Sequence, residues 1–248
     1  MAVLSHTLPR AEALRQRASF YAWLFAVAAV LAWPAPCLAE NHIAAEIPLP
    51  PHRPQGMVSP PAGPPSELCA AIVSQGLIEG DSLPPVVADG GCGISDPVLL
   101  KALLLPGGAK VMIEPPALMR CTLAAALADW VGADIAPEIA RGGDQLVGIA
   151  VAGAYECRGR NRVADAKLSE HASGNALDIA AFVTINGQSH EIARQSAARA
   201  FFQSVQRSAC QRFMTVLGPG SDGYHETHLH VDLQQRGNGS HYCHWVIE

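Results

Sequence analysis

Short apolar segments separated by turn-forming residues run through the chain from Glu67 onward. Residues 67–75 (ELCAAIVSQ) predict a short helix that ends at Gly76. Residues 91–103 (GCGISDPVLLKAL) predict a turn followed by an apolar strand, and residues 109–116 (AKVMIEPP) predict another strand or an edge piece. This part of the chain is therefore expected to combine a helix with strands.

The longest helical pattern covers residues 116–140 (PALMRCTLAAALADWVGADIAPEIA). Pro116 lies near its start, where the missing N–H of proline does no harm. The apolar face of this helix repeats at roughly helical spacing and consists of Leu118, Cys121, Leu123, Ala125, Leu127 and Trp130. Such a face predicts a helix that packs into the core rather than one that binds a cofactor.

Strands and helices also follow one another in the second half of the chain. Residues 145–161 predict a buried strand that runs into an arginine-rich loop, and residues 176–193 predict two strands joined by an Asn-Gly hairpin turn. Residues 194–213 predict an amphipathic helix, and residues 213–237 predict a strand, a Gly/Pro/Asp loop and a last strand. A hairpin among mixed elements indicates an α+β fold.

The first 39 residues have the pattern of a secretory signal peptide, with cleavage after Ala39. Arginines precede an apolar, uncharged run at residues 20–32, and small residues follow it. A retained membrane anchor is the alternative, but the run is shorter than the roughly 20 residues of a spanning helix. Residues 40–66 are rich in proline and predict an extended linker. Residues 67–248 are then a single exported domain, secreted or periplasmic in the cell envelope.

The charge and the cysteines narrow the class of protein further. The formal net charge is −5, and no basic patch is present, which argues against a nucleic-acid partner. Beyond the signal peptide, no apolar run is long enough for a stable membrane span. An even number of cysteines in an exported domain predicts up to three disulfides, whose pairing the sequence leaves open: Cys69, Cys92, Cys121, Cys157, Cys210 and Cys243.

The segment HLHVDL, residues 228–233, brings two histidines together. Because alternate side chains of a strand face the same way, His228 and His230 share a face. Two imidazoles on one face can bind a metal or act together on a substrate. His225 lies in the loop that enters this strand. The alternative is an ordinary surface strand or a hydrogen-bonded core pair.

An aspartate interrupts the apolar segment that follows residues 169–175. Asp178 lies in the run ALDIAAF, where a carboxylate is costly unless it is paired, hydrogen-bonded or bound to a metal. Gly174 permits a tight turn that brings His171 back towards Asp178. With His230 these residues offer two nitrogens and one oxygen, the ligand set of a catalytic Zn²⁺ with one position open.

Two motifs resemble those of known metallopeptidases. SEHASGNALD (residues 169–178) resembles the S-x-H-x-x-G-x-A-x-D signature of the LAS group, which comprises lysostaphin, D-Ala-D-Ala peptidases and sonic hedgehog. HETHLH (residues 225–230) resembles the histidine motif of the murein endopeptidase branch. Together with GAYECRGRN and MTVLGPGSD, they resemble the bacterial extensin-like C-terminal domain family over most of residues 67–243. This resemblance implies an LAS-like α+β fold, with a small central antiparallel sheet and flanking helices.

The resemblance also implies roles for individual residues. Zinc would be the cofactor, and its ligands would be His171, Asp178 and His230. His228 would be the catalytic partner, as a base or as a stabiliser of the oxyanion, and His225 would be a second catalytic histidine. Many D-Ala-D-Ala relatives carry a glutamate three residues before the last ligand, where this chain has Thr227. Glu226 is out of register, so the general base stays open.

Three further residues are candidates for binding substrate. Relatives carry an arginine shortly after a tyrosine equivalent to Tyr155, and it binds a substrate carboxylate. Arg158 is the first choice for this role and Arg160 the second, with a solvated loop as the alternative. Ser169 matches the serine of the signature and binds a ligand or simply forms a turn. Asp222 is a candidate for orienting a histidine, or for capping a turn.

These observations favour an exported zinc hydrolase that cleaves an amide bond in peptidoglycan peptides, as an endopeptidase or a carboxypeptidase. The missing glutamate keeps a second hypothesis open, a zinc-bearing but non-catalytic module that binds the cell envelope. A third hypothesis is a structural envelope protein held by disulfides and lacking metal. The scissile bond and the oligomeric state do not follow from the sequence.

Overall fold

The computed structural model describes residues 64–163 and 165–247. The predicted signal peptide, residues 1–39, and nearly all of the predicted linker, residues 40–66, lie outside these residues, so both stay predictions. Within the described part of the chain, no helix is long and apolar enough to cross a membrane.

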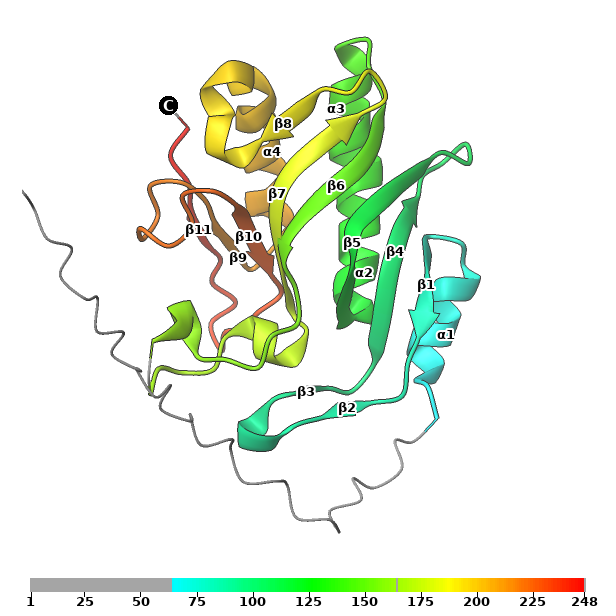
Figure 1. Ribbon diagram of the computed structural model, residues 1–248, viewed down its shortest axis with the longest axis vertical. Coiled ribbons are helices and arrows are strands. Elements are labelled where there is room, and N and C mark those ends of the chain that lie inside the picture. Colours follow the sequence, from blue (N-terminus) through cyan, green and yellow to red (C-terminus); the bar gives the residue numbers. More distant parts are fainter. Residues whose placement is uncertain (1–63, 164, 248) are drawn as a thin grey trace, which may run out of the picture. The chain divides into compact units, whose positions relative to one another are not determined.

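A large mixed sheet forms the centre of the domain (Figure 1). It has nine strands in the order β1-β4-β5-β6-β7-β10-β9-β11, and β8 pairs with β7 beside this path. Its strands are β1 (Ile78–Ser82), β4 (Pro97–Leu104), β5 (Lys110–Arg120), β6 (Leu146–Gly153), β7 (Ala176–Thr184), β8 (Ser189–Glu191), β9 (Thr215–Leu217), β10 (Leu229–Asp232) and β11 (Tyr242–His244). Two short strands, β2 (Val86–Val87) and β3 (Gly93–Ile94), form a separate pair.

The mixture of helices and strands agrees with the predicted class, but the prediction of a small antiparallel sheet is wrong. The sheet is wide, and two of its strand pairs are parallel, β5 with β6 and β9 with β11. The parallel pairing of β5 and β6 arises because helices connect them, and such a crossover brings the chain back to run in the same direction. Edge strands β1 and β11 extend the sheet at either end and were not predicted.

Helices cover one face of the sheet, and α2, α3 and α4 lie behind it in Figure 1. They are α1 (Glu67–Ser74), α2 (Cys121–Trp130), α3 (Ala136–Arg141) and α4 (Arg199–Arg212), and one π-helical turn, η2 (Val131–Ile135), joins α2 to α3. In α4 the buried residues Phe202, Val205 and Ala209 repeat at helical spacing, as an amphipathic helix requires. Short 3-10 segments complete the fold: η1 (Asp89–Gly91), η3 (Arg160–Arg162), η4 (Glu170–Ser173) and η5 (Ile192–Ala198).

The helix predicted from Pro116 begins five residues later, at Cys121, because residues 116–120 belong to β5. Ala117 and Met119 are buried and alternate with more exposed neighbours, which is the two-residue period of a strand. This segment pairs with the start of β4, Pro97 opposite Arg120. The ladder is irregular between Leu100 and Ala102, where the adjacent prolines of β5 lack the N–H that a regular ladder needs.

All six cysteines of the domain form disulfides, as predicted, and the structure supplies the pairing: Cys69–Cys121, Cys92–Cys157 and Cys210–Cys243. Their Cα atoms lie 5.3 to 5.6 Å apart, within the ordinary range for this bond. Disulfides persist in oxidising compartments. The three bridges therefore fit a secreted or cell-envelope protein.

The turn at Gly174 joins η4 to β7 and depends on glycine. Its φ of +65° lies in the left-handed region that disfavours a side chain. A Cβ at this position would lie 2.6 Å from Ile94 Cδ1 and 3.1 Å from the backbone nitrogen of Arg120. The carbonyl of Gly174 also accepts a hydrogen bond from that nitrogen, at 2.8 Å. The turn is thus held against β3 and the end of β5.

We expect Gly174→Ala to lower the free energy of unfolding by about 2–4 kcal/mol, because it adds a steric overlap to the cost of the left-handed backbone. Gly143→Ala is the matched control, since Gly143 has φ of +81° but open space around a Cβ. It should cost only about 1 kcal/mol. Urea unfolding of both variants measures the difference, and equal losses would contradict the steric argument.

Candidate metal centre

The site begins with a cross-strand pair between β7 and β10. Asp178 lies directly opposite His230 in this antiparallel ladder. Their neighbours Leu177, Ile179, Leu229 and Val231 belong to the hydrophobic core. Because side chains alternate along a strand, Asp178 and His230 point to the opposite face of the sheet, away from the helices. The pairing therefore presents a carboxylate and an imidazole to the same space.

The third member, His171, comes from η4, the short turn that precedes β7. The hydroxyl of Ser169 accepts a hydrogen bond from the His171 backbone N–H, at 3.4 Å, and caps this turn. His171 Nδ1 lies 2.6 Å from the carbonyl oxygen of Ala154. A carbonyl can only accept, so Nδ1 carries the proton, and in the neutral ring Nε2 keeps a lone pair.

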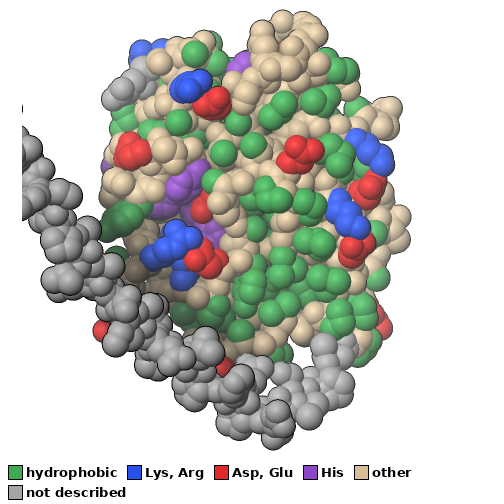
Figure 2. All heavy atoms as spheres, in the orientation of Figure 1, with side chains coloured by type: hydrophobic (Ala, Val, Ile, Leu, Met, Phe, Trp, Pro, Cys, Tyr) green, Lys and Arg blue, Asp and Glu red, His purple; other side chains and the backbone are tan. Residues whose placement is uncertain are grey.

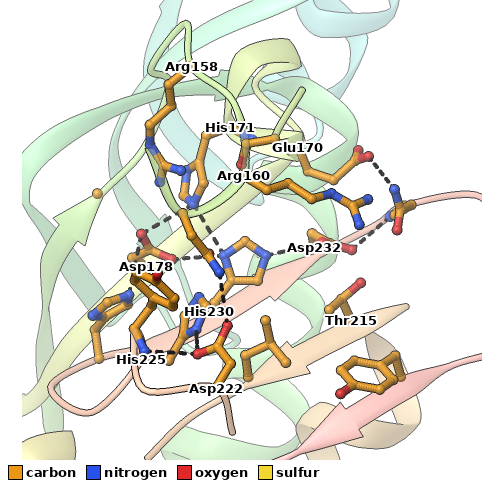
Figure 3. Close-up of a pocket in the computed structure, with 18 of the residues that line it drawn as sticks. Arg158, Arg160, Glu170, His171, Asp178, Thr215, Asp222, His225, His230 and Asp232 are labelled. Atoms are coloured by element: carbon orange, nitrogen blue, oxygen red, sulfur yellow. Dashed lines mark hydrogen bonds and ion pairs between the residues drawn. The ribbon is translucent and has the colours of Figure 1, made fainter. Parts of the chain in front are cut away.

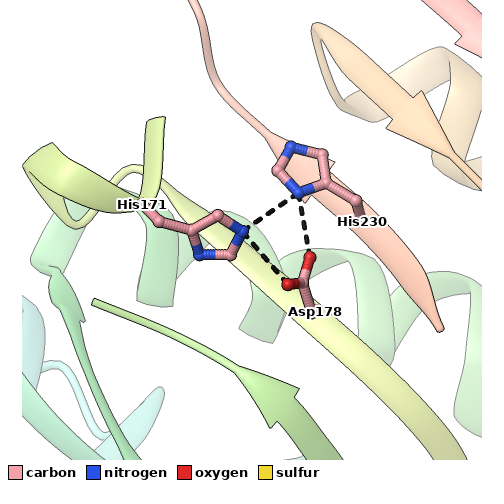
Figure 4. A group of neighbouring side chains, drawn as sticks. All are labelled: His171, Asp178 and His230. Atoms are coloured by element: carbon pink, nitrogen blue, oxygen red, sulfur yellow. Dashed lines mark hydrogen bonds and ion pairs between the residues drawn. The ribbon is translucent and has the colours of Figure 1, made fainter. Parts of the chain in front are cut away.

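The three side chains converge, as the sequence predicted, with their ligand atoms within 4.8 Å of one another (Figure 4). His171 Nε2 lies 3.2 Å from both His230 Nδ1 and Asp178 Oδ2, and His230 Nδ1 lies 2.9 Å from Asp178 Oδ1. Donor atoms of a tetrahedral zinc site, with bonds near 2.0–2.1 Å, lie about 3.3 Å apart. The spacing and the N₂O composition therefore fit a zinc ion.

Hydrogen bonding on the far side of His230 supports the same conclusion. Its Nε2 lies 3.1 Å from Asp232 Oδ2, so the ring contacts a carboxylate at each nitrogen. Burial disfavours the charged ring, but hydrogen bonds with Asp178 and Asp232 outweigh it and raise the pKa of His230 to about 9. Burial likewise opposes ionisation of Asp178, yet His171 and His230 hold its pKa well below the ordinary value. The two carboxylates thus favour a positive charge between them, whether imidazolium or metal.

Gly153 of β6 makes room for Asp178 on the other side. The two residues are paired in the β6–β7 ladder, and a Cβ at Gly153 would lie only 2.8 Å from Asp178 Oδ2. A side chain there would push the carboxylate off the position it shares with the two histidines. Asp178 is therefore flanked by a residue with no side chain and by His230.

The predicted catalytic histidines lie beside this group. His228 Nε2 is 3.7 Å from Asp178 Oδ2, and burial lowers the pKa of His228 despite the opposing effect of Asp178. His225 is buried, and its Nδ1 lies 2.7 Å from Asp222 Oδ1. Asp222 therefore lies where it can orient the ring of a histidine, which is the role considered for it from the sequence. The ring of His225 lies 5.1 Å from that of His228 and 5.5 Å from that of His230.

A cavity of about 760 Å³ opens over the triad and is lined by every site residue that the sequence singled out. Figure 2 shows histidine side chains in a hollow beside arginine or lysine and acidic groups, and Figure 3 shows several of the lining residues. The predicted members of the lining are His171, Asp178, His225, His228, His230, Arg158, Arg160 and Ser169. Segments far apart in the chain thus share one cavity.

The two candidate arginines differ in their contacts. Arg158 Nε donates to Glu156 Oε2 at 2.8 Å, and Arg162 binds the same carboxylate. Among the described residues, no hydrogen bond or ion pair involves the Arg160 side chain. Arg158, the first choice from sequence, is therefore already paired with a carboxylate, whereas the charge of Arg160 at the cavity is unpaired among the described residues.

The position of the glutamate found in many D-Ala-D-Ala relatives is filled by Thr227, which lines the cavity. Glu226 serves another purpose, because its carboxylate accepts a hydrogen bond from the Gly220 backbone N–H and so holds the loop before β10. The carboxylates that line the cavity outside the triad each have hydrogen-bond partners, and they are Glu156, Glu170, Asp222 and Asp232. This arrangement leaves the histidines as the groups best able to move a proton.

Sequence reasoning missed two contributors to the site, Asp232 and Glu156. A signal for Asp232 was present, because it stands two residues after His230 and therefore on the same strand face. Glu156 precedes Cys157 in an irregular loop, and nothing in the local pattern indicates its partners. Gly153 was also overlooked, as its role depends on pairing with a strand that follows 23 residues later.

Residues 67–244 match the family model described as "Extensin-like protein C-terminus". This range contains the triad, both additional histidines, the candidate arginines and all six disulfide-bonded cysteines. No curated protein and no solved structure matches the chain. Because the matched range spans well over half of the 248 residues, the chain belongs to the family of extensin-like proteins defined by this C-terminal domain.

Proposed function

We propose that this protein is an exported zinc-dependent hydrolase that cleaves an amide bond in peptidoglycan peptides. The observation that supports it best is the convergence of His171, Asp178 and His230 at the floor of a cavity. Three protein ligands leave a fourth position open, which is typical of catalytic rather than structural zinc. Kinship with the LAS metallopeptidases, suggested by the motifs, is part of this proposal.

Zinc bound at the triad would polarise a carbonyl and supply a nucleophile at neutral pH. The protein's own groups would handle the proton. His228 Nε2, close to Asp178 and inside the cavity, accepts a proton from the nucleophile and returns it to the leaving amine. His225, held through Nδ1 by Asp222, presents Nε2 as a second proton-carrying atom or as a hydrogen-bond donor to the developing oxyanion.

Substrate would be held by the loop that carries the arginines. Arg160 offers an unpaired guanidinium, which suits bidentate binding of a carboxylate. Free carboxylates occur on the stem peptides of peptidoglycan, and action there fits an exported, disulfide-bonded domain. Cys92–Cys157 ties the backbone directly before Arg158 to the segment that precedes β3.

A zinc-bearing binding module is the second candidate. It is favoured by one observation, Thr227 in place of a glutamate base. The same cavity would then hold an envelope peptide without turnover. The two candidates share the metal and the ligand, and they differ only in whether a product is released.

Zinc should stabilise the protein through the triad. At free zinc 100 to 1,000 times Kd, we expect about 3–4 kcal/mol of added unfolding free energy, because the ion binds only the folded state. His171→Ala should abolish this gain, whereas His241→Ala should retain it, since His241 lines the cavity outside the triad. Thermal unfolding with and without a chelator, together with metal analysis, gives the measurement. A wild-type protein indifferent to zinc would refute the metal site.

His228→Ala should lower kcat for muropeptide hydrolysis by roughly 10²–10⁴-fold while zinc content stays unchanged, because a proton acceptor is lost and no ligand is. Product release is followed by chromatography of digested muropeptides. Zinc-loaded wild-type protein that retains muropeptides but releases no product would support the binding module instead. An active His228→Ala enzyme would move the role of base to another residue.

Arg160→Ala should raise KM about 10- to 100-fold with little change in kcat, as expected for loss of a charged hydrogen bond that substrate and transition state share. Arg194→Ala is the control, since that side chain is 78% exposed and lies outside the cavity. Steady-state kinetics on peptides with free and amidated carboxylates make the test. A larger effect from Arg158→Ala would show that the guanidinium bound to Glu156 is the one that binds substrate.

A further inference from the structure

Asp232 lies at the end of β10 and is buried, with 3% of its surface exposed. Both oxygens of its carboxylate are engaged. Oδ2 lies 3.1 Å from His230 Nε2, and Oδ1 accepts a hydrogen bond from the Gln234 backbone N–H at 2.9 Å. Neither the ligand set nor the proton transfers proposed above use this residue, so its burial next to a metal ligand calls for an explanation.

The contact with His230 determines which ring nitrogen faces the triad. An ionised carboxylate only accepts, so it favours the proton on Nε2. Nδ1 is then the atom directed at Asp178 and His171, at 2.9 and 3.2 Å. A metal ion needs a lone pair at that nitrogen. The carboxylate therefore fixes the ring orientation and, once a metal ion takes the place of a proton at Nδ1, the Nε2–H tautomer that metal binding requires.

Asp232 is also linked to the segment that carries His171 (Figure 3). The side-chain amide of Gln234 donates to Glu170 Oε1 at 2.9 Å, and Asn175 donates to Glu170 Oε2 at 2.7 Å. Glu170 directly precedes His171 in η4. Hydrogen bonds along the cavity lining thus connect the segment at the end of β10 with η4, and the positions of both histidines depend on these shared contacts.

We propose that Asp232 is a positioning residue for zinc, which holds a proton of His230 on Nε2 and keeps Nδ1 directed at the other two ligands. This inference rests on the proposed function, in that the triad holds zinc. Removal of such a partner from a metal-bound histidine typically costs 10- to 100-fold in metal affinity.

Asparagine at this position would disturb the arrangement in a specific way. Its side chain has one acceptor oxygen, whereas Asp232 accepts from two groups. If that oxygen stays with the Gln234 N–H, the amide NH₂ faces His230 Nε2. His230 must then keep its lone pair on Nε2 and its proton on Nδ1, the atom that the metal needs. If the amide is reversed, the buried Gln234 N–H faces another donor instead.

The test is zinc affinity of the full exported chain, measured by competition with a chromophoric chelator. Asp232→Asn should raise the zinc Kd about 10- to 100-fold. Asp222→Asn is the matched control, because it changes the other carboxylate–histidine pair of the cavity, which holds no triad member. Its zinc Kd should stay within about twofold of the wild-type value, because Asp222 holds His225 and contacts none of the proposed zinc ligands.

Unfolding of the zinc-free proteins separates positioning from a purely structural role. A structural role would lower the stability of zinc-free Asp232→Asn and leave its zinc Kd unchanged, which would overturn the inference. If Asp232→Asn does not fold, Asp232→Ser removes the carboxylate without adding volume, and the same loss of affinity is expected. If the wild type binds zinc and these variants bind it with an unchanged Kd, the positioning role of Asp232 is refuted while the proposed function stands. A wild type that binds no zinc refutes the proposed function and this inference with it.

Discussion

The pairing of β7 with β10 is the interaction on which the site depends. It places Asp178 opposite His230 and directs both away from the hydrophobic core. The apolar residues on either side, such as Ile179 and Val231, point to the other face of the sheet and pack into the core beneath the helices. A one-residue slip of β10 would turn His230 into the apolar core and away from Asp178. The hydrophobic alternation of both strands therefore protects the register of the site.

Charge is the second constraint, and it follows from the first. Two buried carboxylates, Asp178 and Asp232, flank one imidazole, and buried charges are tolerated only when they are paired. A cation between them balances the cluster, which explains why the pKa of His230 is raised in the protein without metal. The same arrangement is suited to a dication, with His171 as the additional ligand. The cation that these buried carboxylates require is thus also the one that the proposed chemistry would use.

Family membership and chemistry rest on different grounds here. The match over residues 67–244 establishes the family, but a fold or family does not by itself determine an activity. The proposal of hydrolysis rests on the site, where the three candidate zinc ligands, two further histidines and an unpaired arginine line one cavity. Thr227 marks a departure from the glutamate-dependent peptidases, and in the function that we propose the proton is moved by His228 and His225 instead.

The sequence by itself determined the α+β class, the hairpin of β7 and β8, and the amphipathic helix α4, because these depend on local periodicity and turn residues. It also identified His171, Asp178 and His230, since polar residues stand out in apolar strands and Gly174 indicates a turn. Long-range pairing decided the rest. The width of the mixed sheet, the strand that continues through Pro116, and the pairing of the six cysteines depend on segments distant in the chain. Only the tertiary structure showed that Glu156 pairs with both Arg158 and Arg162 and leaves Arg160 unpaired, because an irregular loop has no repeating pattern from which such pairs follow. Alternation along the strand put Asp232 on the face of His230, but only the structure showed that its carboxylate contacts Nε2 of that ring.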